Sequence, residues 1–135
     1  MAKLRTLWVI HTTANVTDAD TDDKFDLVID GVSPNPNFVG RFHFPDLPNP
    51  DERERARTDE YRFNVESLDA QLSLIQGRNI AIQILGSDAW LPSTIWVIGE
   101  DVDRTRRLVA GFPSWPNNRW WSKDSSEGQA SRRLG

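Results

Sequence analysis

The residues with the most evident chemical potential are aspartates crowded into one short segment. The stretch TDADTDDKF, residues 17–25, holds four Asp among nine residues. Carboxylate oxygens bind hard cations such as calcium, and repulsion between clustered carboxylates falls when a divalent cation binds. Asp is also a common turn residue, so a hydrated acidic turn explains the same composition. The residue types alone leave both interpretations open.

Asp18, Asp20 and Asp22 have the D-x-D-x-D spacing that opens an EF-hand loop. The sixth position of such a loop needs Gly for a sharp turn, and the twelfth needs a bidentate Glu. These positions are Asp23 and Ile29 here, which argues against an EF-hand. A cation would instead be held by carboxylates and backbone carbonyls of a loop at the end of a β-structure.

No arrangement typical of a small enzyme is visible. The chain has no Cys, which excludes disulfides, thiolate catalysis and cysteine metal sites. His11 and His43 each stand alone in a strand-like run, where ordinary sheet positions are expected rather than a zinc site. The segments 86–90 and 111–115 both fail the G-x-S-x-G pattern of a nucleophilic serine. We therefore predict a non-catalytic protein, with a small hydrolase as the weakest alternative.

Six Trp make a second group of interest. Trp8 and Trp96 lie inside apolar runs and are predicted to face the core, together with Phe63, Ile82 and Ile84.

A second set of aromatic residues has a turn-like or terminal position. Trp90 precedes a predicted strand, and Trp120 and Trp121 follow Arg119. Aromatic side chains beside Arg are typical of surfaces that contact lipid headgroups or proteins. These four residues are the candidate binding surface, and packing against the C-terminal part of a sheet is the alternative.

The elements that must position these residues are short strands. Apolar runs recur with alternating or β-branched character and are separated by Gly, Pro and Asn; they lie at residues 4–12, 25–29, 38–44, 61–65, 80–85, 94–98 and 108–112. This pattern predicts an all-β fold, an antiparallel β-sandwich of about eight strands. Leu68, Leu72 and Ile75 have i, i+4, i+7 spacing, so one or two short helical turns are also expected.

Length and charge constrain the rest. A chain of 135 residues suits one domain, predicted over residues 1–121, with a polar C-terminal tail over residues 122–135. The net charge of -4 argues against a nucleic-acid partner. No apolar run is long enough for a transmembrane helix and no signal peptide is recognisable, so any membrane role is expected to be peripheral. The compartment stays open, with the absence of Cys favouring the cytoplasm.

Several short stretches match the motifs of one family in order. Residues 7–15, LWVIHTTAN, match a first strand and a following T-G-D turn, and residues 19–22, ADTD, match an A-G-T-D element. Residues 58–65, TDEYRFNV, match a T-D-x-F segment, and residues 88–91, DAWL, match a D-W-[FY]-L turn before a long strand. The segments 112–115 and 119–121 loosely match an F-x-C-x-x-W-L ending. Residues 4–121 thus resemble the PLAT/LH2 domain, the β-sandwich module found beside lipoxygenase and lipase catalytic domains.

The match departs from the family pattern in four places. The T-G-D glycine is Ala14 and its acid is Asn15; the A-G-T-D glycine is Asp20, and the closing cysteine is absent near Ser114. The chain therefore resembles a divergent PLAT domain.

The resemblance also implies a site and a function. In calcium-binding PLAT members, loops at one end of the sandwich ligate the ion, which places Asn15, Asp20 and Asp22 on the first loop and Asp88 on a turn near it. With Asp18, these residues form the predicted calcium site. The implied function is a non-catalytic recognition or targeting module, assisted by calcium, that binds a membrane surface or a partner protein. The alternative is a structural, protein-docking β-sandwich without metal.

Overall fold

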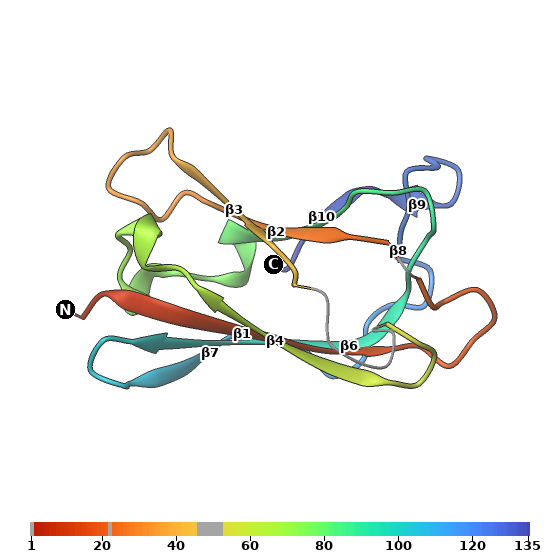
Figure 1. Cartoon of the computed structure of the whole chain (residues 1–135), viewed down its shortest axis with the longest axis horizontal. Coiled ribbons are helices and arrows are strands. Elements are labelled where there is room, and N and C mark those ends of the chain that lie inside the picture. The colour runs from red at the N-terminus through yellow and green to blue at the C-terminus, as the bar shows by residue number, and fades with distance from the viewer. Residues whose placement is uncertain (1, 22, 46–52) are drawn as a thin grey trace.

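Two β-sheets stack face to face and appear as the lower and upper layers of Figure 1. The computed structural model describes residues 2–21, 23–45 and 53–135. The lower sheet has the order β4-β1-β6-β7 and consists of β4 (Thr58–Asn64), β1 (Leu4–Thr13), β6 (Pro92–Asp101) and β7 (Arg106–Phe112). The upper sheet has the order β10-β5-β2-β3 and consists of β10 (Ser131–Arg133), β5 (Ile80–Ile84), β2 (Phe25–Asp30) and β3 (Val39–His43). Every pairing within these two sheets is antiparallel, which confirms the predicted β-sandwich.

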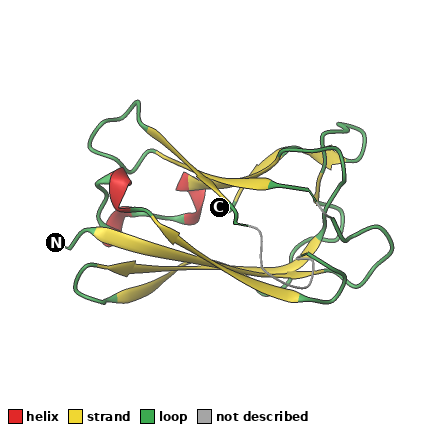
Figure 2. Ribbon diagram, viewed as in Figure 1, coloured by secondary structure: helices red, strands yellow, loops and turns green. Residues whose placement is uncertain are grey.

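The remaining regular elements are short. Strands β8 (Trp120–Trp121) and β9 (Gly128–Gln129) form a small parallel pair. Three 3-10 turns, η1 (Glu66–Leu68), η2 (Leu72–Leu74) and η3 (Gly77–Asn79), lie at the end of the sandwich near the N-terminus (Figure 2). They occupy the region where short helical turns were expected. Among the described residues, no helix has the length and apolar character needed to cross a membrane.

The core lies between the two sheets and follows the period-two pattern. Inward-facing residues of β1 and β6, such as Leu7, Val9 and Val97, are fully buried. Phe63, Ile82 and Ile84 are buried as predicted, with exposed fractions of 5%, 1% and 0%. These side chains stand on alternate positions of their strands, so each strand contributes one face to the core.

The prediction that Trp8 and Trp96 face the core is wrong. Both are only partly buried, because Leu7 and Val9 already face inward and successive side chains point to opposite faces of a sheet. On the outer face of the lower sheet, Trp8 stands opposite Ile98 and Trp96 opposite Ile10. Gly111, opposite Trp96 in β7, leaves room for its ring, since a Cβ there would approach the ring to 2.9 Å.

The structure also corrects the predicted tail at residues 122–135. This segment contains β9 and β10, and β10 pairs with β5 to form an edge of the upper sheet. Leu134 is only 2% exposed, and its backbone N–H donates to the Ile80 carbonyl at 2.9 Å. The sequence of this segment is polar because a short edge strand contributes few side chains to the core. The folded domain therefore extends to Leu134.

Candidate functional site

The aspartate-rich loop and the turn before β6 meet at the end of the sandwich opposite the N-terminus. The loop connects β1 to β2, and the turn connects β5 to β6 (Figure 1). Backbone hydrogen bonds join them at two points: Ala14 N–H donates to the Leu91 carbonyl at 2.9 Å, and Leu91 N–H donates to the Ala19 carbonyl at 3.2 Å. The two segments therefore form one connected surface, as the family resemblance implied.

Side chains fix the turn against the loop as well. The Thr21 hydroxyl donates to the Asp88 carbonyl at 2.6 Å, and Asp88 N–H donates to Asp23 Oδ2 at 2.6 Å. Gly86 is required beside this carboxylate, because a Cβ there would lie 1.9 Å from Asp23 Oδ1. Asp23 therefore serves to hold the turn in place, a role that sequence analysis did not assign to it.

Three of the five predicted metal ligands line one cleft at this end. The acidic cleft, with a volume of about 440 Å³, is lined by Asp18, Asp20, Ser87, Asp88, Ala89 and Glu127. Asp18 adopts a left-handed backbone conformation with φ of 64°, which Asp tolerates better than most residues. Glu127 comes from the segment predicted to be a tail, so sequence analysis missed it. The cleft thus collects four carboxylates from three separate segments.

The other two predicted ligands do not line the cleft among the described residues. Asn15 is exposed, and its side-chain oxygen accepts a hydrogen bond from Arg55 Nη2 at 3.4 Å. Asp22 lies outside the described residues. The charged side chains that line the cleft are all carboxylates, and oxygen ligands of this kind fit a hard cation such as calcium. They are not converged, however: within the described part of the chain, no three His, Asp or Glu residues are close enough to hold a metal ion.

Trp90 lies in the core and not on a binding surface, which corrects its predicted role. It is 0% exposed, and its indole N–H donates to the Thr13 hydroxyl at 2.9 Å. Its ring belongs to a buried aromatic cluster that surrounds the Arg53 guanidinium, whose carbon lies 4.1 Å from the Phe25 ring centre and 5.8 Å from that of Trp90. Such contacts offset part of the cost of burying a cation. Nothing in the local sequence distinguishes Arg53 from the neighbouring surface arginines.

His11 shares this buried cluster. Its ring lies 4.7 Å from the ring of Trp90 and 5.3 Å from that of Tyr61, measured between centres. Neither ring nitrogen hydrogen bonds to another described residue. Burial, and then the nearby charge of Arg53, hold the pKa of His11 well below its usual 6.5. The imidazole is therefore neutral at physiological pH and forms part of the core.

The other candidate surface residues are divided between core and surface. Trp121 is 0% exposed and donates its indole N–H to the Ile82 carbonyl at 2.7 Å, so it is a core residue and its predicted surface role is wrong. Trp120 is partly buried, and Arg119 is exposed. The alternative of sheet packing thus holds for Trp90 and Trp121. Of the predicted binding surface, Arg119 is the residue that remains exposed.

Solved structures of similar fold are known. No protein-family model matches the chain, and no curated protein matches it. Among solved structures, the alpha toxin from Clostridium absonum is similar with a TM-score of 0.75 and 22% identity, over 99% of this chain and 32% of the toxin. An alpha-toxin of Clostridium perfringens, isolated from avian strain SWCP, is similar with a TM-score of 0.67 and 20% identity, over 98% of this chain and 31% of the toxin. The chain spans about a third of the length of these toxins, and at this identity the likeness shows the β-sandwich fold alone.

Proposed function

We propose that this protein is a non-catalytic recognition module that binds a membrane surface through the end carrying the acidic cleft, with calcium as the bridging ion. The observation that carries this proposal is that Asp18, Asp20, Asp88 and Glu127, from three separate segments, line one cleft. The PLAT-like fold supports it, because loops at one end of the sandwich are where the resemblance implies calcium and membrane contacts.

Calcium suits the cleft by its donor chemistry. The ion takes six to eight oxygen ligands at about 2.3–2.6 Å, from carboxylates, carbonyls and water. The cleft provides carboxylates whose mutual repulsion a divalent cation would relieve. Because these carboxylates are not converged, binding must draw them together. We therefore expect weak affinity, with a dissociation constant of about 10⁻⁴–10⁻³ M, as in extracellular calcium modules.

The overall charge gives the ion a further role. A protein with a net charge of -4 and a carboxylate-lined end is repelled by anionic lipid headgroups. A calcium ion held at that end would reverse the local charge and leave ligand positions for headgroup phosphate oxygens. Membrane binding should therefore require calcium and should depend on these carboxylates.

Cosedimentation with vesicles of phosphatidylcholine and phosphatidylserine tests the proposal. The wild-type protein should bind in millimolar calcium and be released by EDTA, and the variant Asp18→Asn/Asp20→Asn should not bind. The variant Glu60→Gln/Asp103→Asn removes the same charge from exposed positions outside the cleft and should behave as wild type. Equal vesicle binding by wild type and the Asp18→Asn/Asp20→Asn variant would refute the proposal.

Calcium binding itself can be measured by thermal unfolding. A ligand that binds only the native state raises its stability by RT ln(1 + [L]/Kd), which is about 1.4 kcal/mol at ten times Kd. The cleft variant should lose this increase. If about 10 mM calcium does not change the melting temperature of the wild-type protein, the proposed calcium site is refuted. The docking module without metal is then the alternative.

One observation favours that alternative, a docking module without metal. The outer face of the lower sheet carries Trp8, Ile10, Trp96 and Ile98 in neighbouring register positions, with Leu108 beside them and 53% exposed. The Trp and Ile side chains are half-buried, and the Arg106 guanidinium lies 4.9 Å from the Trp8 ring centre, so the apolar surface is partly covered. Apolar patches on a protein surface can mark sites that contact other proteins. Calcium-independent capture of a partner that Leu108→Asp abolishes would support it, and capture unaffected by that substitution would not.

A further inference from the structure

A second, basic cavity lies on the C-terminal segment, apart from the acidic cleft. The basic cavity has a volume of about 500 Å³ and is lined by Trp115, Arg119, Gln129, Ser131, Arg132 and Arg133. No acidic residue is among the described residues that line it. Such a concentration of positive charge is unusual for a protein with a net charge of -4.

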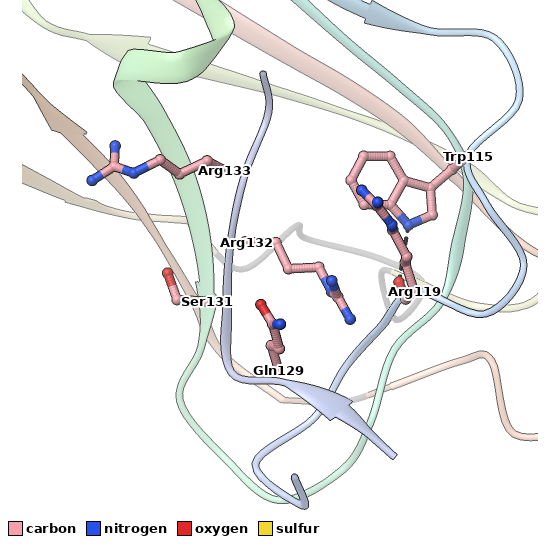
Figure 3. A pocket seen from close by; sticks show the side chains of 6 residues that line it. All are labelled: Trp115, Arg119, Gln129, Ser131, Arg132 and Arg133. Carbon is pink, nitrogen blue, oxygen red and sulfur yellow. Dashed lines mark hydrogen bonds between the residues drawn. The ribbon is translucent and has the colours of Figure 1, made fainter. Parts of the chain in front are cut away.

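Arg132 points into this cavity because of its register. It stands opposite Ile82, a core-facing residue of β5, so its side chain projects from the inner face of the edge strand β10. Its Nε donates to the Trp120 carbonyl at 3.0 Å, which fixes the guanidinium group and leaves its terminal nitrogens available. In Figure 3, Arg132 and Gln129 extend on the side of β10 that faces Arg119.

The backbone of Arg119 is held by hydrogen bonds on the other side of the cavity from Arg132 (Figure 3). Its carbonyl accepts the indole N–H of Trp115 at 2.9 Å, and its own N–H donates to the Pro116 carbonyl at 3.1 Å. Trp115 in turn is stacked on Trp121, with ring centres 5.1 Å apart. The position of Arg119 therefore rests on two tryptophans of the core.

The two arginines form a pair of like charges without compensation. Neither makes an ion pair with a carboxylate in the described part of the chain. Burial, and then the charge of Arg119, lower the pKa of Arg132. Arg133 differs, because it points to the other side of β10 and makes a two-pronged ion pair with Asp30 at 2.8 and 2.9 Å (Figure 3).

We propose that the basic cavity binds a phosphate group, held between the guanidinium groups of Arg119 and Arg132 with the Gln129 amide as a further donor. Guanidinium groups present planar pairs of N–H donors that match the oxygens of phosphate, and two of them balance its charge. An inward-pointing charge also protects an edge strand from pairing with another chain. Protection of the edge strand would need only Arg132. It does not explain why Arg119 lies on the other side of the same cavity.

The first test uses inorganic phosphate and calorimetric titration, at constant ionic strength and about pH 7.5. The wild-type protein should bind saturably, and Arg119→Gln and Arg132→Gln should each weaken binding by about tenfold or more, which corresponds to the loss of one charge-assisted hydrogen bond. Lys123→Gln removes the same charge from an exposed residue outside the cavity and should bind as wild type. Arg119 is exposed, so Arg119→Gln should fold even if Arg132→Gln does not.

The second test asks where the phosphate comes from. Vesicles of phosphatidylcholine with about 20% phosphatidic acid are mixed with each variant in EDTA, which excludes the calcium-dependent binding proposed above. Binding that Arg119→Gln abolishes and Lys123→Gln retains identifies a lipid headgroup. Saturable phosphate binding without vesicle binding identifies a soluble phosphate compound. Absence of saturable binding in both tests, or equal binding by all variants, would overturn the proposal without affecting the acidic cleft.

Discussion

Replacing His11 with Phe should remove a pH dependence of stability that the buried imidazole creates. The pKa of His11 in the folded protein is well below 6.5, because the ring is buried and lies near Arg53. In the unfolded chain, His11 takes up a proton below about pH 6.5. The unfolded state therefore binds more protons than the folded state in this range, so the free energy of unfolding falls as the pH falls.

The size of this effect follows from the linkage relation. As long as folded His11 stays neutral, the free energy of unfolding falls by up to about 1.4 kcal/mol per pH unit below pH 6.5. Integrated between pH 7.5 and pH 5.5 with an unfolded pKa of 6.5, the loss is about 1.4 kcal/mol. Phe keeps the ring contacts with Trp90 and Tyr61 and removes two nitrogens that make no hydrogen bond to another described residue.

Urea unfolding of the wild-type protein and His11→Phe at pH 7.5, 6.5 and 5.5 measures the difference. Carboxylates contribute equally to both proteins, so the wild type should lose about 1.4 kcal/mol more than the variant over this range. His43→Gln keeps His11 and removes the other histidine, whose side chain is 81% exposed but contacts Asp26, and this variant must still lose stability in acid. Parallel stability profiles for wild type and His11→Phe would refute the conclusion that His11 is buried in its neutral form.

Three further predictions concern packing. Trp121→Ala should lower the free energy of unfolding by about 3–5 kcal/mol, because a fully buried aromatic is lost with its hydrogen bond to Ile82. Trp96→Ala should lower the free energy of unfolding by only about 1 kcal/mol, which is the contribution of a cross-strand pair on the outer face of a sheet. If urea unfolding shows equal losses for Trp96→Ala and Trp121→Ala, the assignment of Trp96 to the outer face and Trp121 to the core is wrong. Removing residues 128–135 should lower the melting temperature by many degrees, since β10 and Leu134 are lost; an unchanged melting temperature would restore the tail interpretation.

The fold class was predictable from the sequence because its signals are local. Alternating apolar residues and turn residues between them require no knowledge of distant contacts. Alternation fixes the period of a strand but not which face is buried when both faces are apolar. In the run Leu7-Trp8-Val9-Ile10, both choices were plausible, and the larger side chain was placed inside wrongly.

The sites were less predictable because they depend on long-range pairing. The resemblance to PLAT domains placed Asp20 and Asp88 at one end, but nothing indicated that Glu127 would join them. Arg132 points inward only because it pairs with Ile82, and that register cannot be read from a polar edge strand. Because residues 122–135 are polar, they were predicted to form a tail outside the domain. That wrong prediction is the reason that neither Glu127 nor the basic cavity was identified from the sequence.

The number of Asp in residues 17–30 is larger than the number of carboxylates that a ligand in the acidic cleft could reach. This segment holds six Asp, and three of them have structural partners. Asp23 accepts the N–H of Asp88 and holds the turn; Asp26 is 4% exposed and contacts His43 and Arg41; Asp30 pairs with Arg133, which lowers the pKa of Asp30. Asp18 and Asp20 are the two that line the acidic cleft.

This division explains how an acidic segment can serve both folding and binding. Asp26 pairs with Arg41 of β3 and Asp30 pairs with Arg133 of β10, so opposite charges connect β2 to strands on either side of it in the upper sheet. Asp18 and Asp20 lie before β2 begins, and neither forms an ion pair with another residue in the described part of the chain. In the proposed function, a cation bound in the cleft would meet these two carboxylates. A cation therefore has most to stabilise at these two residues, and they are the ones to substitute first.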